Sequence, residues 1–336
     1  MKRRNSLSAL LPVLVCATLT ATGLPDPAQA AERLRVATQY AEDHPTTVAL
    51  NQFKDRVEEE SDGQIKVRIF PANQLGDYTQ IYEELRRGTI EMGLISVPSQ
   101  FDPRLEVIYL HYLAMNYDEA EKIYAPGSAL FDAVEKLHSD LGVKFLGFNV
   151  EGFGGLGLTK MPDNAHSPEQ AKGILLRVPP MAVFKTTADD QGFQTVSVPF
   201  AELYTALQTG VADGWSGGPP LVNYLQFRDV IKYFLVNNNF FENTSYLISQ
   251  EKWDELSAED QALIQAAVDD LAKKSFEIAK QSDQEYLDKM KADNIEVIAL
   301  SDEELTAWAT HAREVTWPKL EERLSKELVE SLQTQY

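Results

Sequence analysis

One arginine stands in a segment where arginines are uncommon. Residues 175–179 read LLRVP, so Arg177 lies in the middle of an apolar run that is typical of a buried strand. Burying a guanidinium without a partner is costly, and its planar fork matches a carboxylate or sulfonate with two parallel hydrogen bonds. Two interpretations stay open. Arg177 either pairs with a carboxylate inside the protein or lies in a cleft where it binds an anionic ligand.

A serine in a glycine-rich segment is the second candidate. Residues 214–218 read GWSGG, which fits the G-x-S-x-G nucleophile motif of α/β-hydrolases, and a short strand is predicted before it over residues 211–213. Ser216 would be the nucleophile and His311 its base. Two prolines follow directly, so the helix that this motif requires would begin late. A loop that needs close backbone approach explains the glycines as well.

A third segment resembles a cofactor motif. Residues 152–157 read GFGGLG and fit the G-x-G-x-x-G fingerprint of dinucleotide-binding sites, but residues 159–163 (TKMPD) predict a loop where the fingerprint requires a helix. We interpret the segment as a flexible crossover between two domains. The five histidines lack metal-ligand spacing, and no phosphate-binding P-loop motif occurs, so we expect neither a metal nor a cofactor.

Composition excludes further classes of protein. Acidic residues outnumber basic ones by 51 to 31 and no Lys- or Arg-rich block occurs, so we expect no nucleic-acid partner. The chain is 44% hydrophobic and 24% charged, an ordinary globular balance. Its single cysteine, Cys16, lies near the N-terminus, and we expect no disulfide or thiol nucleophile in the mature protein.

The N-terminus carries an export signal. Three basic residues precede a mostly apolar stretch, and residues 28–30 (AQA) form the small-x-small pattern of a signal-peptidase site. We predict a signal peptide over residues 1–30, cleavage after Ala30 and a periplasmic mature protein. The apolar stretch is shorter than the roughly 20 residues of a spanning helix. The choice between general secretion and twin-arginine export stays open.

The remaining chain alternates short strands with helices, which predicts an α/β fold with mostly parallel sheets. One helix is longer than a single domain needs. Residues 259–292 repeat apolar or small side chains at helical spacing, and Ser257 precedes them as an N-cap. At 1.5 Å per residue this helix would be about 50 Å long, so we expect it to span two lobes.

Three segments carry a family pattern. They are residues 177–180 (RVPP), residues 198–214 (VPFAELYTALQTGVADG) and residues 70–91, which contain FPANQLG and EELRRGTIE. They resemble the solute-binding subunits of TRAP transporters (tripartite ATP-independent periplasmic transporters) of the C4-dicarboxylate-binding type. The resemblance covers essentially the whole mature chain. It implies a two-lobed α/β periplasmic-binding-protein fold, each lobe a mixed, mostly parallel sheet flanked by helices, with one long helix spanning both lobes.

The same resemblance divides the chain into lobes with a ligand cleft between them. We predict lobe I over residues 31–154 plus about 243–280. Lobe II would comprise residues 155–242 plus about 281–336.

The resemblance also implies roles for individual residues. Arg177 would anchor the carboxylate of the ligand, and Phe200 would cover the ligand from the second lobe. Tyr40 and Ser96 are placed in the cleft by their positions at the ends of first-lobe strands. An apolar or stacking wall is expected from four aromatic side chains, which are Tyr40, Phe153, Phe200 and Trp215.

The chain departs from the family pattern in two places. Residues 215–219 (WSGGP) stand where many members have an asparagine that also holds the carboxylate, and Gly214 replaces a metal-binding glutamate of another branch. The second arginine that many relatives carry near residues 156–158 is missing. One arginine without a second cation suggests a small anion with a single strongly held acidic group.

Three more residues complete the candidate site. Asn149 is added to the ligand-binding set. Glu42 and Glu151 either lie near the cleft, where they would hold the cationic end of a zwitterion, or occupy solvated loop positions.

We therefore predict a binding protein rather than an enzyme. This binding protein closes by a hinge over a small organic acid and delivers it to a TRAP membrane permease. The resemblance implies a monomer. An exported hydrolase that uses Ser216 and His311 is the alternative, and a scaffold protein without a ligand is a third reading. Dicarboxylates, monocarboxylates, sulfonates and aromatic or zwitterionic acids all stay open as ligands.

Overall fold

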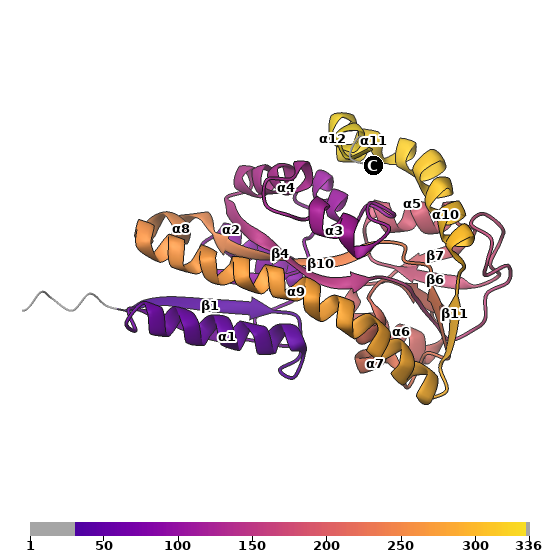
Figure 1. Ribbon diagram of the computed structural model, residues 1–336, viewed down its shortest axis with the longest axis horizontal. Coiled ribbons are helices and arrows are strands. Elements are labelled where there is room, and N and C mark those ends of the chain that lie inside the picture. The colour runs from indigo at the N-terminus through magenta and orange to yellow at the C-terminus, as the bar shows by residue number, and fades with distance from the viewer. Residues whose placement is uncertain (1–30, 334–336) are drawn as a thin grey trace, which may run out of the picture. The chain divides into compact units, whose positions relative to one another are not determined.

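The computed structural model describes residues 31–333, so the predicted signal peptide, residues 1–30, lies outside the described residues. Two β-sheets organise the described part of the chain, and helices cover both of them (Figure 1). Among residues 31–333, no helix is both long and apolar enough to cross a membrane.

The first sheet has five strands in the order β2-β1-β3-β10-β4. They are β1 (Glu32–Thr38), β2 (Ile65–Phe70), β3 (Met92–Ile95), β4 (Val143–Phe153) and β10 (Phe241–Ser249). Strand β1 is parallel to β2 and β3, whereas β10 is antiparallel to both β3 and β4. This mixture arises because β10 enters the sheet from the opposite end.

Helices bury both faces of this sheet. On one face, Leu34 and Val36 of β1 pack with Phe53 of α1 (Pro45–Glu60). On the other face, Ala37 packs with Leu85 of α2 (Tyr78–Arg86), and α4 (Ala129–Asp140) lies against β4. Successive side chains of β1 point to opposite faces of the sheet and pack against helices on both faces, as expected of a strand covered on both sides.

The second sheet has six strands in the order β11-β9-β5-β8-β6-β7. They are β5 (Leu156–Leu158), β6 (Leu175–Val178), β7 (Gln194–Ser197), β8 (Gly214–Ser216), β9 (Tyr233–Val236) and β11 (Glu296–Ala299). Strand β5 is antiparallel to both neighbours, and the other pairs are parallel. The helices connecting these strands are α5 (Ala182–Asp190), α6 (Leu203–Thr209) and α7 (Pro220–Phe227).

Two extended segments cross between the sheets side by side. Strand β4 leads into β5 through Gly154 and Gly155, and residues 237–240 lead from β9 into β10. The Gly154 N–H donates to the carbonyl of Phe240 at 2.9 Å. A Cβ at Gly154 would lie 2.4 Å from the Phe240 ring, and one at Gly155 would lie 2.5 Å from the Phe234 ring. The glycine-rich segment is therefore a crossover, as predicted, but the expected flexibility is wrong because it is tightly packed. A strand follows it where a dinucleotide site needs a helix.

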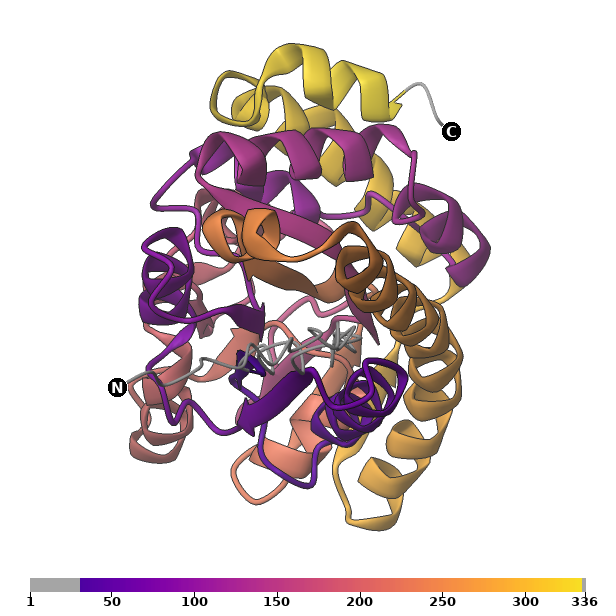
Figure 2. The same cartoon turned by 90° about the vertical axis from the view of Figure 1, so that its left-hand side faces the viewer.

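The predicted long helix is confirmed. Helix α9 (Ala258–Ala292) has 35 residues, and the side chain of Ser257 caps it by accepting from the backbone N–H of Asp260 at 3.1 Å. The helix packs against β4 and α1 of the first sheet and against α7 and β11 of the second. Figures 1 and 2 show it in orange, running past both sheets.

Three C-terminal helices complete the described chain, namely α10 (Asp302–His311), α11 (Trp317–Leu324) and α12 (Lys326–Gln333). Helix α11 packs on the 3-10 segment η1 (Pro103–Tyr109), where Arg323 forms a 2.8 Å ion pair with the buried Glu106. Helix α12 packs on α4. Residues 317–333, which the predicted boundaries assign to lobe II, thus contact elements of lobe I.

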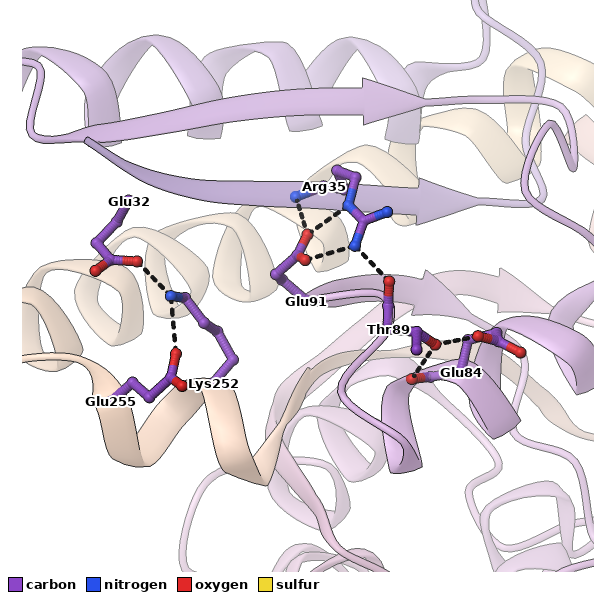
Figure 3. Close-up of polar contacts among 7 residues, drawn as sticks. All are labelled: Glu32, Arg35, Glu84, Thr89, Glu91, Lys252 and Glu255. Atoms are coloured by element: carbon purple, nitrogen blue, oxygen red, sulfur yellow. Dashed lines mark hydrogen bonds and ion pairs between the residues drawn. The ribbon is translucent and has the colours of Figure 1, made fainter. Parts of the chain in front are cut away.

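Ion pairs fix β1 within the first lobe (Figure 3). Arg35 holds Glu91, at the start of β3, through its Nε at 2.9 Å and its Nη2 at 2.6 Å. Lys252 of α8 (Gln250–Glu255) bonds Glu32 and also Glu255, the latter at 3.2 Å. Arg35 is 43% exposed, so this pairing orients the strand more than it stabilises the fold.

The predicted two-lobed α/β class with one spanning helix is confirmed, with sheets that are mixed. Three short strands, β5, β8 and β11, were not predicted, and the strand predicted over residues 211–213 is wrong because β8 begins at Gly214. Segments of three or four residues carry too little periodicity to identify a strand.

Candidate functional site

A pocket lies where the carboxyl ends of strands from both sheets meet the crossing segments. Its walls come from the ends of β1 and β3, from η1, β4 and β10 on one side, and from β6, β8 and α7 on the other. The lining residues are Gln39, Tyr40, Tyr78, Ser96, Tyr109, Glu151, Arg177, Pro179, Met181, Phe200, Trp215, Ser216, Gly217, Gly218, Val222, Gln226 and Glu242.

Arg177 is held in the pocket by its strand. Strand β6 runs between β7 and β8, which places Arg177 beside Val196 and Trp215. The side chain is 3% exposed, and its Nε donates to the carbonyl of Val198 at 2.8 Å. Within residues 31–333, no carboxylate lies within 4 Å of the guanidinium, so the internal ion pair considered from the sequence is not formed. The two Nη atoms have no hydrogen-bond partner among the described residues.

Burial lowers the pKa of Arg177 to about 10, although nearby Tyr78 and Glu242 raise it. The guanidinium therefore stays protonated at neutral pH. A buried, positively charged fork with unused donors is suited to binding a carboxylate with two hydrogen bonds.

Two carboxyl groups line the same pocket. Glu151 lies on β4 and Glu242 on β10, and both are partly accessible. The strands pair antiparallel, Glu242 with Gly152 and Asn243 with Val150, so Glu151 is the extra residue of a β-bulge. A bulge redirects the side chain of the inserted residue, which explains how neighbouring strands present both carboxyls to one pocket.

Each carboxyl has a weak set of protein partners. Glu151 accepts from the hydroxyl of Tyr40, and Glu242 accepts from the N–H of Gly218 at 3.4 Å. Burial raises the pKa of Glu242 to about 7, against the lowering effect of backbone donors and of Arg177. Burial and the charge of Glu242 raise the pKa of Glu151 well above its ordinary value. Near neutral pH the pair therefore retains a proton.

Aromatic side chains form the wall next to Arg177. The indole Nε1 of Trp215 donates to Asn223 at 2.9 Å, and its ring lies 6.2 Å from the ring of Phe200. A Cβ at Gly217 or Gly218 would approach the Trp215 ring within 2.7 Å, so the glycines let the backbone pack against the indole. The glycines of this segment thus have a packing role.

The opposite wall is polar. Gln39 and Ser96 form two hydrogen bonds, from Nε2 to Oγ at 3.0 Å and from the Ser96 N–H to Oε1 at 3.1 Å. The hydroxyl of Tyr109 accepts from the N–H of Val97 at 3.0 Å. The Tyr40 ring stacks on His44 with the centroids 4.4 Å apart. These contacts fix the loops after β1 and β3 at the rim of the pocket.

Of the nine residues named from the sequence for the ligand site, six line this pocket, namely Tyr40, Ser96, Glu151, Arg177, Phe200 and Trp215. Asn149 does not, because its side chain is buried within the first sheet and donates to Thr244 at 3.2 Å. Glu42 is exposed in the loop before α1 and is not among the lining residues. The predicted wall residue Phe153 packs in the core, with its ring 4.9 Å from that of Phe241.

Sequence reasoning missed several lining residues, above all Glu242 and the tyrosines Tyr78 and Tyr109. A signal existed for Glu242, because it follows two phenylalanines in a segment that becomes a buried strand, much as Arg177 interrupts LLRVP. The tyrosines carry no such signal, since tyrosine is common in cores and at surfaces alike.

The hydrolase arrangement is not assembled. The Oγ of Ser216 accepts from Asn239 at 3.3 Å, whereas His311 on α10 contacts the carbonyl of Asp190 at 3.1 Å and does not line the pocket. In residues 31–333, no group of three or more His, Cys, Asp or Glu side chains could hold a metal ion.

Comparison with known proteins decides the class. The sequence model of the bacterial extracellular solute-binding proteins of family 7, DctP, matches residues 36–322. The chain belongs to this family.

Individual relatives agree with the assignment. The C4-dicarboxylate-binding periplasmic protein DctP of Rhodobacter capsulatus is 26% identical over 89% of this chain and 90% of its own length. The ectoine-binding periplasmic protein TeaA of Halomonas elongata is 25% identical over 78% of this chain and 77% of its own length. A solved TRAP periplasmic solute-binding protein of Haemophilus influenzae with bound L-gulonate is 24% identical. It covers 91% of this chain and 100% of that chain with a TM-score of 0.79.

This protein is therefore a TRAP solute-binding subunit and not an enzyme, and the hydrolase alternative built on Ser216 and His311 is not supported.

Proposed function

We propose that this TRAP solute-binding protein captures a small organic acid by holding its carboxylate on Arg177. The observation that carries the proposal is a buried guanidinium that faces the pocket with both Nη atoms unused. Trp215 and Phe200 would cover the apolar part of the ligand. Relatives named for C4-dicarboxylates and ectoine, and a solved one holding L-gulonate, support a small carboxylate as the ligand class.

Capture would be coupled to delivery by closure of the two lobes. A ligand that contacts both walls of the pocket binds the closed form better and therefore shifts the population toward it. The closed form would be the one that the membrane permease recognises. We place the mature protein in the periplasm as a monomer, after cleavage behind Ala30, with no metal in the site and with lobes divided as predicted from the sequence, except that residues 241–242 and 317–333 join lobe I.

The test is a thermal-shift screen of the mature protein, residues 31–336, against dicarboxylates, hydroxy and keto acids, sulfonates, sugar acids and betaine-like zwitterions. A ligand at 100 times its dissociation constant stabilises the folded state by about 2.7 kcal/mol. Arg177→Ala should abolish the shift. Arg228→Ala is the matched control, because Arg228 is exposed at the end of α7 and lies outside the pocket.

A stabilising acid whose effect survives Arg177→Ala would overturn the anchor. If no class of acid shifts the melting temperature of the wild-type protein, the proposed ligand class is overturned.

A further inference from the structure

The pocket contains more acidic than basic side chains. Arg177 is its only lysine, arginine or histidine among the described residues, whereas Glu151 and Glu242 both line it. Neither carboxyl has a basic partner within 4 Å in the described chain. A dianion has two carboxylates. Arg177 would hold one of them, and the other would lie beside the carboxyl groups of Glu151 and Glu242.

An acidic pair by itself does not define a ligand site, but here a second feature points to a ligand. Arg177 is 97% buried, its Nη atoms have no protein partner, and it lines the same pocket from the opposite sheet. The pocket therefore receives a cation from the second sheet and an acidic pair from the first.

We propose that Glu151 and Glu242 select an organic acid that carries a positively charged nitrogen at its far end. This inference rests on the proposed function, because it requires the carboxylate of the same ligand to be held by Arg177. The nitrogen would be received by the two carboxyl groups and by the neighbouring rings of Tyr40 and Tyr109, which line the same wall.

The protonation of the pair supports this arrangement. Near neutral pH the raised pKa values of Glu151 and Glu242 keep a proton in the pocket, since burial disfavours two adjacent negative charges. A cationic ligand group would favour the ionised form, displace that proton and pair with the carboxylates. The other titratable groups close to the pair are Arg177, Tyr40, Tyr109 and Tyr246. Burial lowers the pKa of Arg177 only to about 10 and raises the pKa values of Tyr109 and Tyr246 above their ordinary value, so these three keep their protons at neutral pH.

Three probes of equal chain length separate the far-end charge from shape. They are 4-(trimethylammonio)butanoate, its isostere 5,5-dimethylhexanoate, which is uncharged at the far end, and the dianion glutarate, each measured by isothermal titration calorimetry. Homologous sets with one methylene fewer and one more cover the spacing between the two ends. We expect the zwitterion of the best-fitting set to bind at least tenfold more tightly than its isostere and its dianion.

Glutamine variants test whether the pair causes this preference. In the double variant Glu151→Gln with Glu242→Gln, the zwitterion should lose its advantage over the isostere to within about twofold, while the isostere retains its own affinity. Glu42→Gln is the matched control, because Glu42 is exposed outside the pocket and should change nothing. A thermal melt without ligand confirms that each variant folds.

A second measurement needs only the wild-type protein. Calorimetry in two buffers of different ionisation enthalpy should show proton release when the zwitterion binds and no release when the isostere binds. Equal or weaker binding of the zwitterion, or binding of another acid with no response to any zwitterion, would overturn this inference and leave the proposed function intact. If no acid of any class binds, the proposed function itself fails.

Discussion

The two walls of the pocket have opposite chemistry although they meet around one small space. The wall from the second sheet carries a guanidinium and two aromatic rings, with Arg177 fixed by a strand on each side. The wall from the first sheet and its crossing strand carries Tyr40 and two carboxyl groups. A ligand with opposite charges at its ends would satisfy both walls only when the lobes are closed. If the lobes close as proposed, this arrangement of charges would make closure selective for such a ligand.

The largest loss of binding free energy in this comparison should come from a variant that keeps the positive charge at position 177 but changes its shape. Arg177→Lys keeps a cation but loses the planar fork and the Nε hydrogen bond to Val198. We expect a loss of about 1.5–3 kcal/mol of binding free energy, since hydrogen bonds to charged groups have that magnitude. Calorimetry with the strongest acid of the screen measures it. An unchanged dissociation constant would mean that the fork geometry of Arg177 plays no part in anchoring.

The carboxyl groups of Glu151 and Glu242 should make ligand binding depend on pH. The pKa of Glu242 is about 7 without ligand, and a cationic group would lower it, so binding releases a proton below that pH. The affinity for a zwitterion should therefore rise with pH, by up to about tenfold per unit, and level off above neutrality. The affinity for glutarate should fall over the same range, because its second carboxylate favours the protonated pair.

Titrations between pH 5.5 and 8.5 measure both slopes. The Glu151→Gln, Glu242→Gln double variant should give flat profiles for both ligands. Parallel profiles for the zwitterion and glutarate in the wild-type protein would contradict the contrast between the walls.

The smallest effect should come from the aromatic cover. Phe200→Leu keeps an apolar side chain of similar size but removes the ring that lies beside Trp215, which should cost about 0.5–1.5 kcal/mol of binding. Phe227→Leu is the matched control, because Phe227 also packs on Trp215 but does not line the pocket. The control should lower the melting temperature and leave the dissociation constant unchanged. The reverse pattern would remove Phe200 from the ligand contacts.

The basic wall could be predicted from the sequence more completely than the acidic wall. Arg177 is conspicuous because its neighbours are apolar, and the segment around Phe200 and Trp215 carries a family pattern. Glu151 was named with Glu42 as its equal, since both follow predicted strands. They differ because of a β-bulge, in which Glu242 pairs with Gly152 and Glu151 is left unpaired. The pairing of strands that lie far apart in the sequence cannot be deduced from either strand alone.

The same limit explains Asn149. It lies two residues before Glu151, where strict alternation along a strand would give both side chains the same side of the sheet. The bulge interrupts that alternation, so Asn149 bonds Thr244 inside the sheet while Glu151 lines the pocket.

The position of β10 has a consequence for how the protein is made. This strand lies between β3 and β4, yet its last residue, Ser249, comes after about three quarters of the 336 residues have been synthesised. Until then the first sheet lacks the strand that joins its two parts, and pairing over such sequence separations is slow. Late completion keeps the nascent chain unfolded for longer. Members of this extracellular family must leave the cytoplasm, and for export by general secretion, which takes unfolded chains, strand order lengthens the time available before folding.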